Sequence, residues 1–198
     1  IMIGDVMRFL DNVLSDFINK APDQFKDAKY SAERERSVGL GVMGFHSFLQ
    51  KHRIPLESVM AKSWNKKIFK QIHEQVNKAS NDLAEERGAC PDAAEYGFKE
   101  RFSNKTAIAP TASISIICGG ASPGVEPIAA NSYTHKTLSG SFNVRNRYLE
   151  EILETHGKND DETWSTITTN QGSVSHLDFL TDLEKDVFKT AFELNQKW

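Results

Sequence analysis

The spacing of apolar residues predicts several helices along this chain. Over positions 2–20 they fall three or four residues apart, which is the period of one helix face: Ile3, Val6, Met7, Leu10, Val13, Leu14, Phe17 and Ile18. A more regular series predicts a second long helix: Trp64, Ile68, Ile72, Val76, Ala79 and Leu83. Gly88 follows this series at the place where a glycine commonly ends a helix.

Weaker patterns predict the remaining elements. Ser31 is a candidate N-cap for a helix that runs to about Lys51, after a polar loop at Lys20–Tyr30. The β-branched run at Ile114–Cys118 predicts a buried strand, and Gly119–Gly124 predicts a loop. Two more helices are expected at Val144–Leu153 and Leu177–Leu194, with a solvated acidic turn at Asp160–Glu162 between them. The expected fold class is therefore α/β and rich in helix.

Composition restricts the class of protein. The 198 residues are 39% hydrophobic and 26% charged, which is ordinary for one globular domain. A net charge of −3 gives no electrostatic footprint for nucleic acid. No apolar run approaches the roughly 18 residues that span a bilayer, and nothing resembles a signal peptide. We expect a cytoplasmic chain, and because both ends fall within helical patterns we expect residues 1–198 to be a single partial domain.

Several features that suggest chemistry have simpler explanations. Gly39–Gly44 matches G-x-G-x-x-G, but the charged residues before it exclude the buried strand that a dinucleotide site needs, so we expect glycines that let a helix pack closely. The six histidines have no zinc-ligand spacing, and no metal site is expected. Cys90 and Cys118 are too few for a disulfide framework, which favours a reducing compartment, and are expected to be buried structural thiols.

One segment carries candidate chemistry. Ala109–Ser115 reads Ala-Pro-Thr-Ala-Ser-Ile-Ser, in which small residues let a phosphate approach the backbone. Hydroxyl groups and successive backbone N–H groups can then donate hydrogen bonds to its oxygens. Serine- and threonine-rich turns are common, so this segment alone indicates little.

Four segments together resemble the catalytic large subunit of ribonucleotide reductase. They occur in the family's order and are Arg36–Gly44, Glu86–Pro91, Pro110–Pro127 and Ser132–Phe142. The resemblance implies the later part of a ten-stranded α/β barrel. It also implies that substrate phosphates bind to the hydroxyl and backbone groups of Thr111 and Ser113 and to the backbone N–H groups of Ala112 and Ile114. Some relatives have a hydroxyl residue at the position of Ile114, so one side-chain contact is expected to be lost.

The resemblance also implies what these residues do not supply. The family's Asn-x-Cys-x-Glu finger motif and its reducible cysteine pair are absent, so no catalytic residue, metal ligand or cofactor is assigned. The complete enzyme needs a radical generator, either a metal-containing small subunit or cobalamin, together with a dithiol reductant. The expected partners are a ribonucleoside diphosphate, the N-terminal part of the catalytic subunit and the radical-generating small subunit. The stretch Ser132–Phe142 favours a class I enzyme, whereas Ile114–Gly120 also resembles class II chains.

Two functions from different classes remain open. The chain is either part of a working ribonucleoside-diphosphate reductase or a catalytically inactive binding or assembly module derived from that barrel. In either case a strand at Ile114–Cys118 cut from its barrel would have unpaired edges. We therefore expect an exposed apolar surface that receives the rest of the subunit, or a second copy of the chain in a homodimer.

Overall fold

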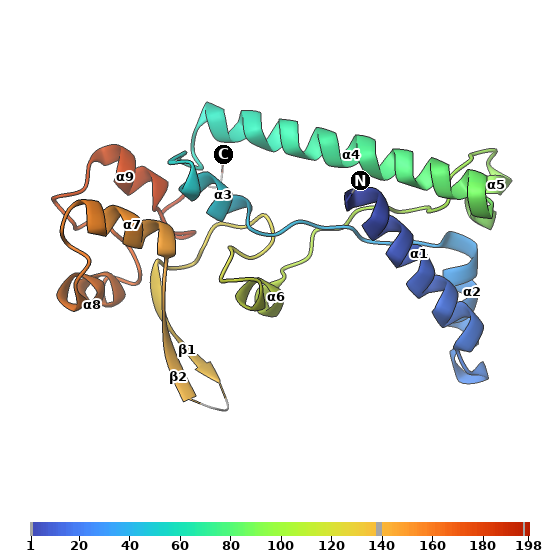
Figure 1. Ribbon diagram of the computed structural model, residues 1–198, viewed down its shortest axis with the longest axis horizontal. Helices are drawn as coiled ribbons and strands as arrows, with labels where there is room; N and C mark the ends of the chain where they lie inside the picture. The colour runs from blue at the N-terminus through green and yellow to red at the C-terminus, as the bar shows by residue number, and fades with distance from the viewer. Residues whose placement is uncertain (1, 138–139, 196) are drawn as a thin grey trace. The chain divides into compact units, whose positions relative to one another are not determined.

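The computed structural model describes residues 2–137, 140–195 and 197–198, and most of its regular structure is helical (Figure 1). The helices are α1 (Met2–Lys20), η1 (Asp23–Phe25), α2 (Lys26–Glu35), α3 (Phe45–Lys51), α4 (Val59–Arg87), α5 (Pro91–Glu95), α6 (Ala112–Ile117), α7 (Arg147–Thr155), α8 (Asp161–Thr169) and α9 (Asp182–Val187). Strands β1 (Ser132–Thr137) and β2 (Gly140–Arg145) form an antiparallel pair in which Ser132 lies opposite Arg145. Within the described residues, no helix is both long and apolar enough to cross a membrane.

The chain divides into two compact units. Unit 1 comprises Ile1–Gly41 and Asn65–Ala109, and unit 2 comprises Val42–Trp64 and Pro110–Trp198. In unit 1 the predicted apolar faces meet, because Met7 of α1 is buried in one cluster with Val76, Ala79 and Leu83 of α4 and with Phe102. The predictions for both long helices are confirmed, and Gly88 has the positive φ of +88° that a C-terminal glycine adopts.

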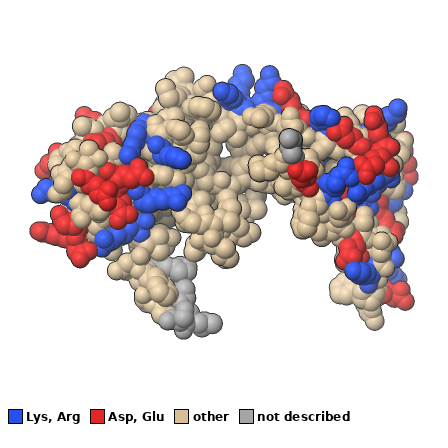
Figure 2. Space-filling model, viewed as in Figure 1, with Lys and Arg blue, Asp and Glu red and all other residues tan. Residues whose placement is uncertain are grey.

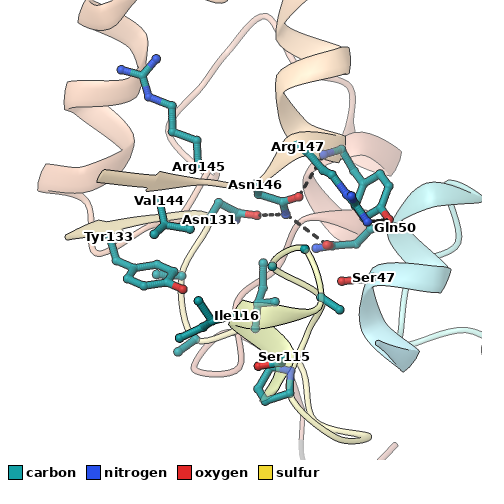
Figure 3. Close-up of a pocket in the computed structure, with 18 of the residues that line it drawn as sticks. Ser47, Gln50, Ser115, Ile116, Asn131, Tyr133, Val144, Arg145, Asn146 and Arg147 are labelled. Atoms are coloured by element: carbon teal, nitrogen blue, oxygen red, sulfur yellow. Dashed lines mark hydrogen bonds between the residues drawn. The ribbon is translucent and has the colours of Figure 1, made fainter. Parts of the chain in front are cut away.

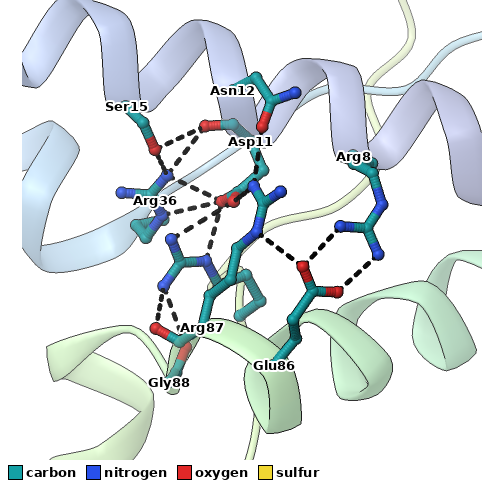
Figure 4. A network of polar contacts seen from close by, with 9 residues as sticks. Arg8, Asp11, Asn12, Ser15, Arg36, Glu86, Arg87 and Gly88 are labelled. Atoms are coloured by element: carbon teal, nitrogen blue, oxygen red, sulfur yellow. Dashed lines mark hydrogen bonds and ion pairs between the residues drawn. The ribbon is translucent and has the colours of Figure 1, made fainter.

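A buried carboxylate joins three segments of unit 1 (Figure 4). Asp11 of α1 is fully buried and accepts hydrogen bonds from the guanidinium groups of Arg36, Arg87 and Arg101. Its Oδ1 lies 2.7 Å from Arg36 Nη2 and 2.8 Å from Arg101 Nε, and its Oδ2 lies 2.8 Å from Arg87 Nη1. Burial opposes ionisation of Asp11, but the hydrogen bonds from the arginines outweigh it and lower the pKa of this carboxyl.

The prediction of one helix from Ser31 to Lys51 is wrong. Helix α2 begins within the predicted loop and ends at Glu35, where Arg36 adopts a left-handed conformation with φ of +45°. The chain then runs extended, and Leu40 forms a parallel bridge with Thr106. A Cβ at Gly39 would lie 2.8 Å from the Cβ of Ala107, so the expected close packing is confirmed. The segment that packs closely is extended, however, and not the helix that was predicted.

Unit 2 has its core among its C-terminal helices. Eleven buried residues form one cluster: Tyr148, Leu149, Ile152, Leu153, Trp164, Ile167, Val174, Leu177, Leu180, Val187 and Phe188. The helix predicted around Val144–Leu153 is confirmed as α7, although it begins only at Arg147, after the N-cap Asn146. The predicted acidic turn is wrong, because Asp160 caps α8 by accepting a hydrogen bond from the backbone N–H of Thr163. The last helix is shorter than predicted and ends at Val187.

The strand predicted at Ile114–Cys118 is also wrong, since Ala112–Ile117 forms helix α6. Ile114 and Ile117 are exposed, with 56% and 83% of their surface accessible. The two cysteines are free, but only Cys90 is buried as expected, because Cys118 follows the exposed end of α6. The β1–β2 hairpin occupies a stretch for which the apolar pattern predicts no strand.

Candidate functional site

The candidate phosphate segment forms the start of helix α6. Thr111 precedes the helix in a left-handed conformation, with φ of +50°, and no side chain caps the first turn. In an α-helix the first backbone N–H groups have no partner within the helix, and here these belong to Ala112, Ser113 and Ile114. The first hydrogen bond of the turn runs from Ser115 N to Thr111 O. Three consecutive N–H groups are thus available to an acceptor at this turn.

The loop after α6 holds this turn in place. The hydroxyl oxygen of Thr111 accepts a hydrogen bond of 2.7 Å from the backbone N–H of Gly124. Two residues before Gly124, the backbone N–H of Ser122 donates to the hydroxyl of Ser47 in α3, and the backbone N–H of Ser47 donates to the hydroxyl of Ser122. Gly44 N also donates to Ser122 O, so the loop fills the start of α3 where a dinucleotide would need an open turn.

A cavity of about 600 Å³ is lined in part by this loop (Figure 3). Helix α6 contributes Ala112, Ser115 and Ile116 to its wall, and the hairpin contributes Tyr133 and Val144. The lining is mostly apolar, and the volume is in the range of small-molecule sites in proteins. Ala112 belongs both to this wall and to the candidate phosphate segment, so the two features share one helix turn.

The polar part of the cavity wall is a chain of amide side chains. The side-chain nitrogen of Asn146 donates to Gln50 Oε1 at 3.0 Å and to Asn131 Oδ1 at 2.8 Å. Asn131 in turn donates to the backbone carbonyls of Gly172 and Phe188. Because each amide is held at more than one atom, this wall is rigid. The pattern of apolar residues along the chain carries no signal of it.

On the molecular face shown in Figure 2, Lys and Arg lie among Asp and Glu, so neither sign of charge dominates a charged region. At the cavity, Arg145 pairs with Asp161 at 2.7 Å, while the guanidinium of Arg147 donates to the hydroxyl of Tyr148 and lies over its ring. Within the described residues, no group of three or more His, Cys, Asp or Glu side chains is placed to hold a metal ion.

The predicted site residues lie together on one turn. Thr111 is half-buried, and Ala112, Ser113 and Ile114 are exposed. Ser115 differs, because it is buried and its hydroxyl donates to the backbone carbonyl of Ala112. The backbone N–H and hydroxyl groups that a ligand could reach at the helix start therefore belong to Thr111–Ile114.

The comparisons with known proteins agree on one family. The family model described as "Ribonucleotide reductase, barrel domain" matches residues 2–100 and 92–198. Relatives described as the large subunit of ribonucleoside-diphosphate reductase include those of Invertebrate iridescent virus 6, 48% identical over all of this chain, and Invertebrate iridescent virus 3, 46% identical over 97% of it. The chain belongs to the ribonucleotide reductase family and corresponds to sequence of its barrel domain.

A solved structure shows the same fold. The alpha subunit of the class Id ribonucleotide reductase of Actinobacillus ureae superposes on 95% of this chain with a TM-score of 0.86 and 40% identity, and the match covers 34% of that subunit. A vitamin B12-dependent ribonucleoside-diphosphate reductase of Thermoplasma acidophilum is 34% identical over 96% of the chain and is covered to 25%. The matches cover 21% and 31% of the two viral subunits. The chain therefore spans between about a fifth and a third of the length of these relatives.

Proposed function

We propose that this chain is part of the catalytic subunit of a ribonucleoside-diphosphate reductase and supplies the segment that binds the substrate's phosphates. The observation that carries the proposal is the turn at Thr111–Ile114, where three backbone N–H groups lack partners within the helix. Thr111 and Ser113 of the same turn also carry hydroxyl groups. Backbone N–H groups at a helix start attract anions, and a diphosphate has enough oxygens to accept from several donors at once.

The role of this segment is binding and positioning. The proposed reduction removes the ribose 2′-hydroxyl, and it needs a radical and reducing thiols that other parts of the enzyme supply. Cys90 is buried and Cys118 follows the exposed end of α6, and neither corresponds to a family catalytic cysteine. We propose a class I partner, a metal-containing radical-generating small subunit, although two vitamin B12-dependent relatives are 34% and 30% identical to this chain.

A chimeric large subunit tests the proposal directly. The 198 residues would replace the matching stretch of the Invertebrate iridescent virus 6 subunit, and reduction of a ribonucleoside diphosphate would be measured with a small subunit and a dithiol. In this background Ser113→Ala removes one hydroxyl donor to a charged phosphate. Such a bond contributes about 1.5–3 kcal/mol, so we expect KM to rise at least about 10-fold while kcat changes little.

Ser113→Glu is the sharper variant. A glutamate in the first turn favours the helix, because its charge complements the helix dipole. The same charge repels a phosphate, so stability should hold while diphosphate binding falls by about 100-fold or more. The matched control is Ser115→Ala, which removes the hydroxyl bonded to the Ala112 carbonyl and should leave KM within about threefold.

The alternative function predicts a different result. If the chain is an inactive assembly module, the chimera should fold and bind its small subunit but reduce no nucleotide. An active chimera in which Ser113→Glu leaves KM unchanged would retain the enzyme assignment and refute the phosphate role of this turn.

A further inference from the structure

Helix α6 and the loop after it are bonded to each other at two places. The backbone N–H of Ala121 donates to the carbonyl of Ser115 at 3.1 Å, which ties the loop to the body of the helix. The backbone N–H of Gly124 donates to the hydroxyl of Thr111 at 2.7 Å, which ties the loop to the helix start. Thr111–Gly124, hereafter the α6 segment, is therefore held together internally. The position of the candidate phosphate turn then depends on what anchors this segment to the rest of unit 2.

Two successive residues of α3 anchor the α6 segment and the chain that follows it. Ser47 forms two reciprocal hydrogen bonds with Ser122, of 3.1 and 2.8 Å. His46 precedes Ser47, and its Nδ1 accepts a hydrogen bond of 3.0 Å from the backbone N–H of Ile128. Ile128 lies four residues beyond the end of the α6 segment. Ser47 thus holds the segment itself, and His46 holds the chain just after it.

The anchoring face of α3 is polar although it is buried. His46 and Gln50 each expose 1% of their surface, and Ser47 exposes 7%. Gln50 lies four residues after His46 and three after Ser47, so all three border one face of the helix. Burying polar side chains costs stability unless they are hydrogen-bonded, and well-packed apolar residues often stabilise a buried face more. Bonded polar groups instead specify one arrangement of the segments that they join.

We propose that His46 is a positioning residue for the phosphate-binding turn and acts through Ile128 and the α6 segment without touching the substrate. This inference rests on the proposed function. The bonds between α3 and Ser122 hold the α6 segment at one point, which does not by itself fix its orientation. The bond from Ile128 to His46 supplies a second point, and the carbonyl of Ile128 also accepts from the backbone N–H of Ala191. Because three N–H groups of the turn must converge on one phosphate, a displacement of about 1 Å weakens binding.

Substitutions at His46 separate the hydrogen-bond acceptor from the bulk of the side chain. Asparagine carries Oδ1 at the same number of bonds from Cβ as histidine carries Nδ1, so His46→Asn keeps the acceptor. His46→Leu fills the space but leaves the N–H of Ile128 without this partner. His46→Gln moves the acceptor one bond outward, and it provides the same test if His46→Leu does not fold.

The readout is the KM for a ribonucleoside diphosphate in the chimeric large subunit. We expect His46→Leu and His46→Gln to raise KM at least about 10-fold while kcat stays within about threefold. His46→Asn should keep KM within about threefold of the wild-type value, because the acceptor is restored. An unchanged KM in both His46→Leu and His46→Gln would overturn the proposal, and so would an equal rise in His46→Asn.

A core substitution in the same unit provides the matched control. Ile167 is fully buried in the cluster of the C-terminal helices, and Ile167→Val weakens folding by leaving a small cavity. It leaves the bond between His46 and Ile128 intact, so KM should stay within about twofold. A rise in KM equal to that of His46→Leu would attribute the effect to lost stability and overturn the positioning role.

Hydrogen exchange tests the anchoring without turnover. In the chimera, the backbone amides of residues 120–124 should exchange at least about 10-fold faster in His46→Leu or His46→Gln than in the wild type, and Ile167→Val should leave them unchanged. Unchanged exchange in the His46 variants would overturn the proposal even if the chimera reduces nucleotides. Faster exchange in a chimera without turnover would support the anchoring by His46 while the proposed function fails.

Discussion

Replacing Asp11 by alanine removes the only carboxylate among the groups that pair with Arg36 and Arg101 in the described part of the chain. Both arginine side chains are nearly buried, with 9% and 11% of their surface accessible, so water cannot easily replace the lost partner. Removing one member of a buried ion pair costs about 3–5 kcal/mol, because the other charge remains buried. Arg87 is more exposed, at 28%, and should add little. We expect Asp11→Ala to lower the free energy of unfolding of unit 1 by about 3–4 kcal/mol.

The positions of the tryptophans separate the two units in one experiment. The three tryptophans, Trp64, Trp164 and Trp198, all belong to unit 2, whereas α1 and most of α4 belong to unit 1. In urea, tryptophan fluorescence reports unit 2, whereas circular dichroism at 222 nm reports the helices of both units, of which the longest, α1 and most of α4, belong to unit 1. Asp11→Ala should shift the circular-dichroism transition to lower urea by more than it shifts the fluorescence transition. Asp16→Ala on the same helix, which removes an exposed pair with Lys20, should cost less than about 0.5 kcal/mol.

The pH dependence of the Asp11 effect has a defined sign. The pKa of Asp11 is lowered in the folded chain, so its contribution is present above the unfolded value near 3.8 and is lost as pH falls through the folded pKa. The difference between wild type and Asp11→Ala should hold from pH 7 to about pH 4 and narrow below it. A loss no larger than that of Asp16→Ala at pH 7 would refute the buried-charge reasoning.

Three other substitutions test unit 2. Burial lowers the pKa of His46 to about 4, and its Nδ1 accepts a hydrogen bond from the backbone N–H of Ile128. The free energy of unfolding should therefore fall by up to about 3 kcal/mol as the pH falls from 6.5 to 4. His46→Asn keeps an acceptor but does not titrate, and urea titrations of this variant should lack that decline. Gly172 has φ of +80°, and a Cβ there would lie 2.3 Å from Ala130 Cβ, so Gly172→Ala should cost more than about 2 kcal/mol. Gly157→Ala, with φ of +65° and open space, should cost only about 1–2 kcal/mol in the same urea assay, and equal losses would contradict the clash.

The sequence predicted those helices in which apolar residues lie on one face and polar residues on the other. Helices α1, α4 and α7 bury a stripe against a neighbouring core, and that stripe is visible as a spacing of three or four. The first break in the prediction falls at Arg36. Its left-handed backbone ends α2, and its side chain is held by Asp11, which lies 25 positions earlier. Such a long-range contact leaves no mark on the local apolar pattern.

The hairpin was missed for a related reason. Strand β2 does alternate, with Phe142 and Val144 between polar residues, but the alternation is short and the strand is mostly exposed. Val144 also fits the apolar pattern of the helix that follows, and it was assigned to that helix. The family resemblance located this stretch by its residue order, but it did not supply the strand pairing. The polar cavity wall was equally invisible, because Gln50, Asn131 and Asn146 come from separate segments and become one network only through the fold.

The error at Ile114–Cys118 bears on the candidate site itself. In a buried strand, the backbone N–H groups of this segment would donate to neighbouring strands, and few would remain for a ligand. As a six-residue helix, the same segment places the N–H groups of Ala112, Ser113 and Ile114 in the first turn, where the helix has no acceptor for them. The β-branched residues that suggested a strand are exposed at Ile114 and Ile117, so they are not the source of the turn's position. That position comes from the bond between Thr111 and Gly124 and from the pairing of Ser122 with Ser47. A helix replacing the expected strand therefore supports the proposal that this turn binds phosphate.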